Sequence, residues 1–270
     1  TAVNLITRLL DATEGKIFLD GEDITLKTGK SLRVIYRKMQ MVFQTPTDSF
    51  DPRRTLGDGI GESLRNCGMT RHDADAQAAR LLERCGLPAA FAGRYPHEVS
   101  GGQCQRAAIA RALAVKPKVL ICDEATSALD VSVQKTIIEL ITKLQREKNI
   151  TIGFICHDIA LIEQCAHQIA VMYLGNVVEV LPGGQLSKDA VHPYTRALMG
   201  SVFDINMDFS KPIENLEGEA PSPLELPEGC PFQGRCTKCM AICKKEAPQM
   251  VSLTPDHQVA CHLYTESAQK

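Results

Sequence analysis

Short apolar segments alternate with longer amphipathic ones along this chain, and this alternation limits its fold more than any other feature. Apolar runs at residues 40–44, 118–122 and 151–156 predict buried strands. Residues 132–148 predict a helix whose apolar face carries Val133, Ile137, Leu140, Ile141 and Leu144. Strands that alternate with long helices favour a largely parallel sheet with helices on its faces, which is an α/β fold.

Further elements are predicted on either side of these strands. Leu5, Ile6, Leu9 and Leu10 recur at helical spacing, and residues 16–24 predict a hairpin. The segment from about 58 to 114 is helical in pattern, and residues 168–180 predict a closing hairpin.

The texture of the chain changes after about residue 183. A short helix is predicted around residues 192–202, and a stretch rich in proline and acidic residues at 215–229 predicts a linker. We therefore expect two domains, residues 1–183 and a smaller module at 184–270.

Composition excludes several classes of protein. The 270 residues are 44% hydrophobic, which is enough for a packed core, and 30 Lys+Arg against 32 Asp+Glu give a formal charge of −2. This balance argues against a nucleic-acid partner. No stretch approaches the roughly 18 apolar residues of a membrane span, and no secretory signal is present, so we expect an intracellular chain.

Two carboxylates follow directly after the strand at 118–122. Asp123 and Glu124 thus stand at the carboxyl end of a parallel strand, where open α/β sheets bind ligands. In phosphate-transferring sheets the first acid holds magnesium and the second positions a water. The alternative is an ordinary strand end followed by an acidic helix start.

A glycine-rich helix start lies about 20 residues earlier. Ser100, Gly101 and Gly102 precede the alanine-rich run at 107–114. Small residues let backbone amides approach an anion, which the helix dipole favours. The alternative is that Ser100 simply caps the helix. The glycine-rich start stands before a strand that ends in two acids, however, and the two features together indicate a phosphate site more specifically than either does alone.

Five motifs in this order resemble the nucleotide-binding subunits of ABC transporters. They are VFQ ending at Gln44, SGGQ at 100–103, VLICDE at 119–124, SALD at 127–130 and the His157 that follows TIGFIC. The match covers residues 1 to about 182. It implies a P-loop NTPase-like fold with a helical subdomain at about 57–115, with ATP and Mg²⁺ bound.

The resemblance implies roles in hydrolysis for four of these residues. Gln44 would sense the γ-phosphate and magnesium and link them to the membrane partner. Asp123 would bind magnesium through its second shell, Glu124 would polarise the attacking water, and His157 would hold the γ-phosphate and the water in line.

The resemblance also implies a dimer of two such subunits, identical or paralogous. The signature residues would cap the γ-phosphate of ATP on the opposite subunit, while Asp130 would communicate across the dimer. The signature residues are Ser100, Gly101, Gly102 and Gln103.

This chain departs from the family pattern in three places. Val99 and Ala125 replace a usual leucine and proline, both conservatively. The phosphate-binding P-loop, G-x-x-x-x-G-K-[ST], does not occur in the sequence. We therefore expect an N-terminally truncated chain that binds ATP weakly and does not hydrolyse it alone.

The C-terminal motifs resemble the extension of oligopeptide, dipeptide and nickel importer ATPases. They are HPYTRAL at 192–198, EGEAPSP at 217–223, GCPFQGRC at 229–236 and HQVACHL at 257–263. The resemblance implies an ATPase that powers peptide import. The alternatives are a nickel importer of the same subfamily and a non-transport ABC ATPase of repair or translation.

Five cysteines crowd into the last 41 residues. In a reducing cytosol such a cluster indicates a metal site rather than disulfides. The family's cysteines fall on Cys230, Cys236, Cys243 and Cys261, which implies a 4Fe–4S cluster. Cys239 is additional and forms a CxxC with Cys236, a spacing that also suits Zn²⁺. Reduced structural thiols, and a free iron–sulfur or zinc module of another class, are further alternatives.

The implied partners place the chain peripherally at the cytoplasmic face of the cell membrane. They are a second ABC ATPase subunit, transmembrane permease subunits contacted near residues 44–54, and indirectly an extracytoplasmic substrate-binding protein.

Overall fold

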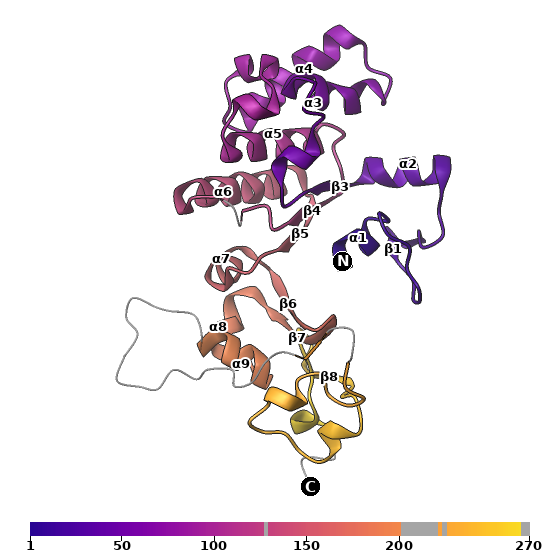
Figure 1. The fold of residues 1–270 in the computed structure, drawn as a ribbon, viewed down its shortest axis with the longest axis vertical. Helices are drawn as coiled ribbons and strands as arrows, with labels where there is room; N and C mark the ends of the chain where they lie inside the picture. The colour runs from indigo at the N-terminus through magenta and orange to yellow at the C-terminus, as the bar shows by residue number, and fades with distance from the viewer. Residues whose placement is uncertain (127–128, 201–220, 223–225, 266–270) are drawn as a thin grey trace. The chain divides into compact units, whose positions relative to one another are not determined.

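The computed structural model describes residues 1–126, 129–200, 221–222 and 226–265 (Figure 1). The chain divides into two compact units, Thr1–His157 and Asp158–Lys270. Among the described helices, none combines the length and apolar character needed to cross a membrane.

A parallel three-stranded sheet forms the centre of the first unit. Its strands, in spatial order, are β3 (Met39–Val42), β4 (Val119–Asp123) and β5 (Thr151–Ile155). Both pairings are parallel, which confirms the predicted topology. Leu120 and Cys122 of the central strand are buried, because helices cover a parallel sheet on its faces.

The apolar pattern predicted one of two helices of this unit, α6 (Val131–Lys148), and missed the other, α2 (Gly29–Lys38). The helix predicted at 132–148 is α6, and Ile137, Ile141 and Leu144 of its stripe are buried. In contrast, α2 was not predicted. It buries Ile35 alone, and four of its ten residues are lysine or arginine, so its apolar residues are few although they fall on one face.

The N-terminal segment is only partly as predicted. The hairpin at 16–24 is confirmed as β1 (Phe18–Leu19) and β2 (Glu22–Asp23). The first helix, α1 (Ala2–Ile6), ends four residues before Leu10, so its predicted extent was wrong. Arg8 adopts a left-handed backbone with φ 60°, which cannot continue a right-handed helix.

The predicted helical region is confirmed as a group of helices (Figure 1). It consists of α3 (Leu56–Arg65), α4 (Arg71–Arg84) and α5 (Gly101–Leu113). Each begins after a hydroxyl residue, Thr55, Thr70 or Ser100, whose side chain accepts a backbone N–H of the first turn. Short 3₁₀ turns at 89–93 and 96–98 lie between α4 and α5, and another at 46–49 precedes α3.

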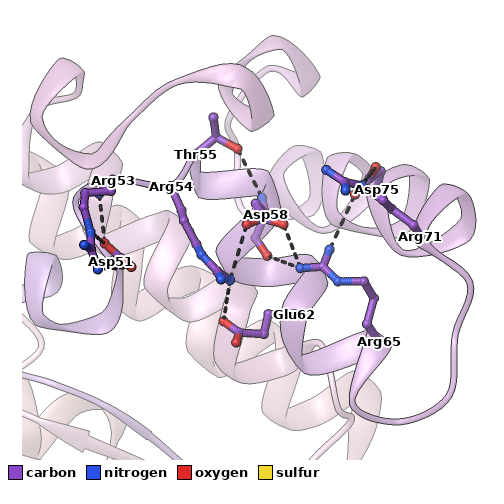
Figure 2. Close-up of polar contacts among 9 residues, drawn as sticks. All are labelled: Asp51, Arg53, Arg54, Thr55, Asp58, Glu62, Arg65, Arg71 and Asp75. Carbon is purple, nitrogen blue, oxygen red and sulfur yellow. Dashed lines mark hydrogen bonds and ion pairs between the residues drawn. The ribbon is translucent and has the colours of Figure 1, made fainter.

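A chain of ion pairs joins α3 to α4 (Figure 2). Arg65 lies 2.7 Å from Asp58 and 3.8 Å from Asp75, which links the two helices. Arg54 lies 3.5 Å from Asp58 and 3.6 Å from Glu62. The charges that precede α3 are therefore balanced within this subdomain.

The second unit contains an antiparallel sheet with strand order β6-β7-β9-β8. The predicted hairpin is confirmed as β6 (Gln168–Tyr173) and β7 (Asn176–Pro182). The strands β8 (Met250–Thr254) and β9 (His257–Ala260) were not predicted.

The helices among the described residues of the second unit are short. They are α7 (Ile159–Cys165), α8 (Leu186–Asp189) and α9 (Pro193–Gly200), with 3₁₀ turns at 183–185, 233–235, 242–244 and 262–264. The helix predicted around 192–202 is thus confirmed as α9. Most of the linker predicted at 215–229 lies outside the described residues.

A buried carboxylate connects three segments of this unit. Glu179 on β7 is fully buried and accepts the backbone N–H groups of Val191 and His192, at 2.8 and 3.2 Å. Its Oε1 also lies 2.8 Å from Nε2 of His257 on β9. The motif that begins at His192 is therefore attached to the sheet through Glu179.

Replacing Arg65 with alanine is expected to lower the free energy of unfolding by about 1–2 kcal/mol, because it removes a charge-assisted bond between half-buried groups. Arg71→Ala is the matched control: Arg71 is 82% exposed at its side chain and 4.0 Å from Asp75, so we expect a change within about 0.5 kcal/mol. Urea unfolding measures both. Equal losses in the two variants would contradict the proposed link between α3 and α4.

Lowering the pH from 7 to 5 is expected to destabilise the second unit by about 2 kcal/mol. Burial lowers the pKa of His192 from 6.5 to about 4, with Glu179 opposing the shift. The unfolded chain therefore binds a proton that the folded chain does not. This stability is complete above pH 6.5 and is lost as the pH falls toward 4.

Urea unfolding followed by tyrosine fluorescence measures this effect, since Tyr173, Tyr194 and Tyr264 lie in this unit. His192→Phe should flatten the pH dependence over this window. An unchanged slope in that variant would show that another group is responsible.

Candidate functional site

Three of the predicted residues follow the ends of the parallel strands. Glu124 comes directly after β4, while Gln44 and His157 each come two residues after β3 and β5. Because the carboxyl ends of parallel strands meet at one edge of the sheet, these side chains gather there.

The three side chains are in direct contact. Nε2 of Gln44 donates to Oε2 of Glu124 at 2.6 Å, and Nε2 of His157 lies 2.8 Å from Oε1. The side chain of Glu124 is 20% exposed and that of His157 is 83% exposed. The carboxylate is therefore held from both sides, and the imidazole remains open to solvent.

The backbone at Glu124 has an unusual conformation. Its φ is 45°, in the left-handed region that a residue with a side chain seldom occupies. The N–H of Glu124 donates to the carbonyl of Ile155 at 3.0 Å, which ties this turn to the end of β5. Strained backbone of this kind often occurs at functional sites.

Asp123 is the last residue of β4. It is half-buried and pairs in register with Ile155. The sequence predicted both acids at the strand end, and the structure places them there. No pattern in the residues indicated the left-handed backbone of Glu124.

The glycine-rich segment forms the start of α5. Oγ of Ser100 accepts the N–H of Gln103 at 3.3 Å, and Oε1 of Gln103 accepts the N–H of Ser100 at 2.9 Å. This capping box leaves the amides of Gly101 and Gly102 without intrahelical partners, as the first turn of any helix does. The structure therefore contains the helix start that an anion would need.

Gly102 lies against the beginning of α6. A Cβ at this position would stand 2.8 Å from Cγ1 of Val133 and 3.7 Å from Cδ2 of Leu129. Asp130 is exposed and precedes α6, and its carbonyl accepts the N–H of Gln134 at 2.8 Å. Residues 127 and 128 of the SALD motif lie outside the described residues.

Four of the five C-terminal cysteines surround one small cavity of about 10 Å³. They are Cys230, Cys236, Cys243 and Cys261. His262, which was not predicted to belong to a site, also lines this cavity, and its Nε2 lies 2.9 Å from the carbonyl of Glu246. Gly229 is required here because a Cβ would stand 2.1 Å from the carbonyl oxygen of Cys243.

The cysteine thiols suit a soft metal in their chemistry. Burial raises the pKa of Cys230 to about 11, and neighbouring thiols including Cys243 and Cys261 add to the shift. A cation would stabilise the thiolates that burial disfavours. Within the described residues, however, no three His, Cys, Asp or Glu side chains stand in an arrangement that would hold a metal ion.

Two protein families match separate parts of the chain. The ABC transporter family matches residues 1–127, and the oligopeptide/dipeptide transporter C-terminal region matches residues 178–243.

Curated relatives match almost the whole chain. It is 43% identical to the probable peptide ABC transporter ATP-binding protein y4tS of Sinorhizobium fredii, covering 99% of this chain and 76% of that protein. It is 44% identical to the oligopeptide transport ATP-binding protein AppF of Bacillus subtilis, covering 98% and 82%.

Solved structures agree in fold. The ATP-binding cassette MJ0796, solved as a dimer bound to ADP and Pi, matches with a TM-score of 0.62 and 29% identity. The match covers 67% of this chain and 78% of that one.

Adding a methyl group at Gly102 is expected to destabilise the chain by about 1–2 kcal/mol, because Val133 is β-branched and cannot move aside freely. Gly101→Ala is the matched control, since nothing lies within 4 Å of the added Cβ. That variant should be neutral or slightly stabilising. Thermal unfolding distinguishes the two, and equal melting temperatures would contradict the close contact.

Proposed function

Because the chain belongs to the ATP-binding proteins of ABC transporters, we propose that it powers the import of di- or oligopeptides by hydrolysing ATP. The observation that carries the proposal is the carboxylate of Glu124, held between Gln44 and His157 at the carboxyl edge of the sheet. A carboxylate in this position can orient and activate an attacking water. The similarity to peptide and oligopeptide transport proteins supports peptides as the cargo.

Each of the four polar residues at this edge of the sheet has a separate role in ATP hydrolysis. Glu124 polarises the hydrolytic water, and His157 holds that water in line with the γ-phosphate. Asp123 holds Mg²⁺ through water, and Gln44 senses the occupied site. The Mg²⁺ ion, when bound, neutralises charge on the phosphates. The contacts of Glu124 with Gln44 and His157 support these assignments.

The signature helix start acts across a dimer. Ser100, Gly101, Gly102 and Gln103 meet the γ-phosphate of ATP bound to the opposite subunit, and Asp130 transmits its occupancy. The capping geometry supports this assignment, because it leaves two glycine amides at the start of a 13-residue helix. The dimeric MJ0796 cassette supports the dimer.

The membrane partner contacts the segment at 44–54, and the chain lies peripherally at the cytoplasmic face of the membrane. An extracytoplasmic substrate-binding protein delivers the peptide to the permeases. The ion pairs of Arg54 with Asp58 and Glu62 support a preformed surface at this segment (Figure 2). Arg53 pairs with Asp51, and its side chain is 88% exposed. We therefore treat Arg53 as a solvated surface charge and not as a specific contact with the membrane partner.

Residues 1–183 form the ATPase domain in this proposal, and residues 184–270 form the extension. Within the extension, Cys230, Cys236, Cys243 and Cys261 hold a 4Fe–4S cluster, with Zn²⁺ as the alternative. Their position around one cavity supports the donor set. Among the described residues no three such side chains already stand in a metal-binding arrangement, so binding would have to draw the thiols closer together. Bound metal would supply a structural staple, which a module this small needs.

Glu124→Gln is expected to lower kcat for ATP hydrolysis about 10²–10⁴-fold while ATP binding survives, because it removes the base without changing shape. The assay joins a P-loop-bearing N-terminal segment of a relative to Thr1 and measures phosphate release and nucleotide affinity. Glu147→Gln, on α6, is the control and should keep full activity. Unchanged turnover in Glu124→Gln would overturn the role of this carboxylate.

The chain purified without oxygen is expected to carry iron and a broad visible absorption that bleaches on reduction. Cys243→Ser should lower the bound metal, whereas Cys67→Ser, at an exposed cysteine, should not. Zinc in place of iron would select the alternative. A reconstituted chain that carries neither metal would contradict the proposed site.

A further inference from the structure

The five cysteines of the C-terminal unit differ in exposure. Cys230, Cys243 and Cys261 are buried, each 8% exposed, whereas Cys236 and Cys239 are only half-buried. The two half-buried thiols are therefore the ones that a small oxidant in solution can reach.

A tight turn brings these two cysteines together. The N–H of Cys239 donates to the carbonyl of Cys236 at 3.2 Å, and Thr237 and Lys238 between them are exposed. Such a turn holds its first and fourth Cα atoms within about 7 Å. A disulfide requires a Cα separation of about 4.4–6.8 Å, so the backbone is already close to the geometry of the bond.

The alternative partner for Cys239 is Cys243, whose surroundings are less favourable. Sγ of Cys243 lies 3.5 Å from the N–H of Met240, and its carbonyl accepts the N–H of Cys230 at 2.7 Å. Cys243 is thus fixed on the buried side of the cluster. The Cys239 thiol nevertheless forms a side-chain hydrogen bond with Cys243, so both thiols are within its reach. Cys236 is taken as the partner because the turn that joins it to Cys239 is exposed, and peptide mapping separates the two pairings.

The electrostatic surroundings show that Cys236, Cys239 and Cys243 lie close together. Burial raises the pKa of Cys239, and the Cys243 thiol adds to the shift both through its charge and through a side-chain hydrogen bond, while the Lys244 ammonium opposes it. Burial also raises the pKa of Cys236, and the neighbouring Cys239 thiol adds to the shift. The two thiols are therefore close enough to influence one another.

We propose that Cys236 and Cys239 form a reversible disulfide with each other. The oxidant is a low-molecular-weight disulfide such as glutathione disulfide. The thiolate of Cys239 attacks one sulfur of the oxidant, and a glutathione thiolate leaves. The thiolate of Cys236 then attacks Sγ of Cys239, and the second glutathione thiolate leaves. The two cysteines lose two electrons and two protons, and one oxidised glutathione becomes two reduced ones.

Oxidation has a consequence for the cavity. Cys236 lines it, but Cys239 is not among the residues that do. A disulfide would therefore withdraw one of the four cysteine sulfurs. This consequence rests on the proposed metal site, whereas the disulfide itself does not.

Peptide mapping tests the proposal on the full chain. The protein is reduced, freed of metal with a chelator, and equilibrated with reduced and oxidised glutathione. After free thiols are blocked, trypsin cuts behind Arg235, Lys238 and Lys244. We expect a disulfide that links the peptide 236–238 to the peptide 239–244, with a yield that rises with oxidised glutathione and reverses with dithiothreitol.

Matched variants keep the test decisive. Cys239→Ser should abolish the linked peptide, and Cys67→Ser, at the exposed cysteine of the first unit, should retain it. A disulfide inside the unlinked peptide 239–244 would show that Cys243 is the partner and would overturn the proposal. Absence of the linked peptide from the metal-free chain at every glutathione ratio would also overturn it. Metal content, measured separately on the untreated chain, decides the cluster proposal.

Discussion

Parallel pairing of three short strands is the constraint on which the candidate catalytic site depends. Gln44 and Glu124 are 80 residues apart in sequence, and Glu124 and His157 are 33 apart. The pairing of β3 with β4 and of β4 with β5 brings all three to one edge of the sheet. The contacts of the carboxylate are short because the register of the strands fixes where each chain segment leaves the sheet.

The sequence predicted those parts of the fold in which apolar periodicity is strong. The strands of the parallel sheet, α6 and the hairpin of β6 and β7 all carry it. It failed where burial is slight: α2 buries only Ile35, and most of β8 is exposed. At the candidate site, the pattern predicted which residues follow the strand ends. It could not predict the left-handed backbone of Glu124, which depends on the hydrogen bond to Ile155.

A buried polar junction organises part of the second unit. The buried carboxylate of Glu179 joins β7, β9 and the segment before α9. Apolar periodicity in the sequence cannot predict such a junction, because it is made by polar groups. Removing one partner of a buried charge is costly, so this junction fixes the arrangement of the segments that it joins. The cysteine cavity is built from segments on either side of the 3₁₀ turns, and Gly229 allows their backbones to approach.

The left-handed backbone of Glu124 sets the needs of folding against those of chemistry. A glycine would adopt this conformation without a steric penalty, whereas glutamate adopts it at a cost. Selection for stability alone would replace Glu124 with glycine. At this position the residue that favours stability therefore differs from the residue that catalysis needs. Consensus or computational redesign that aims to stabilise this chain should leave Glu124 unchanged.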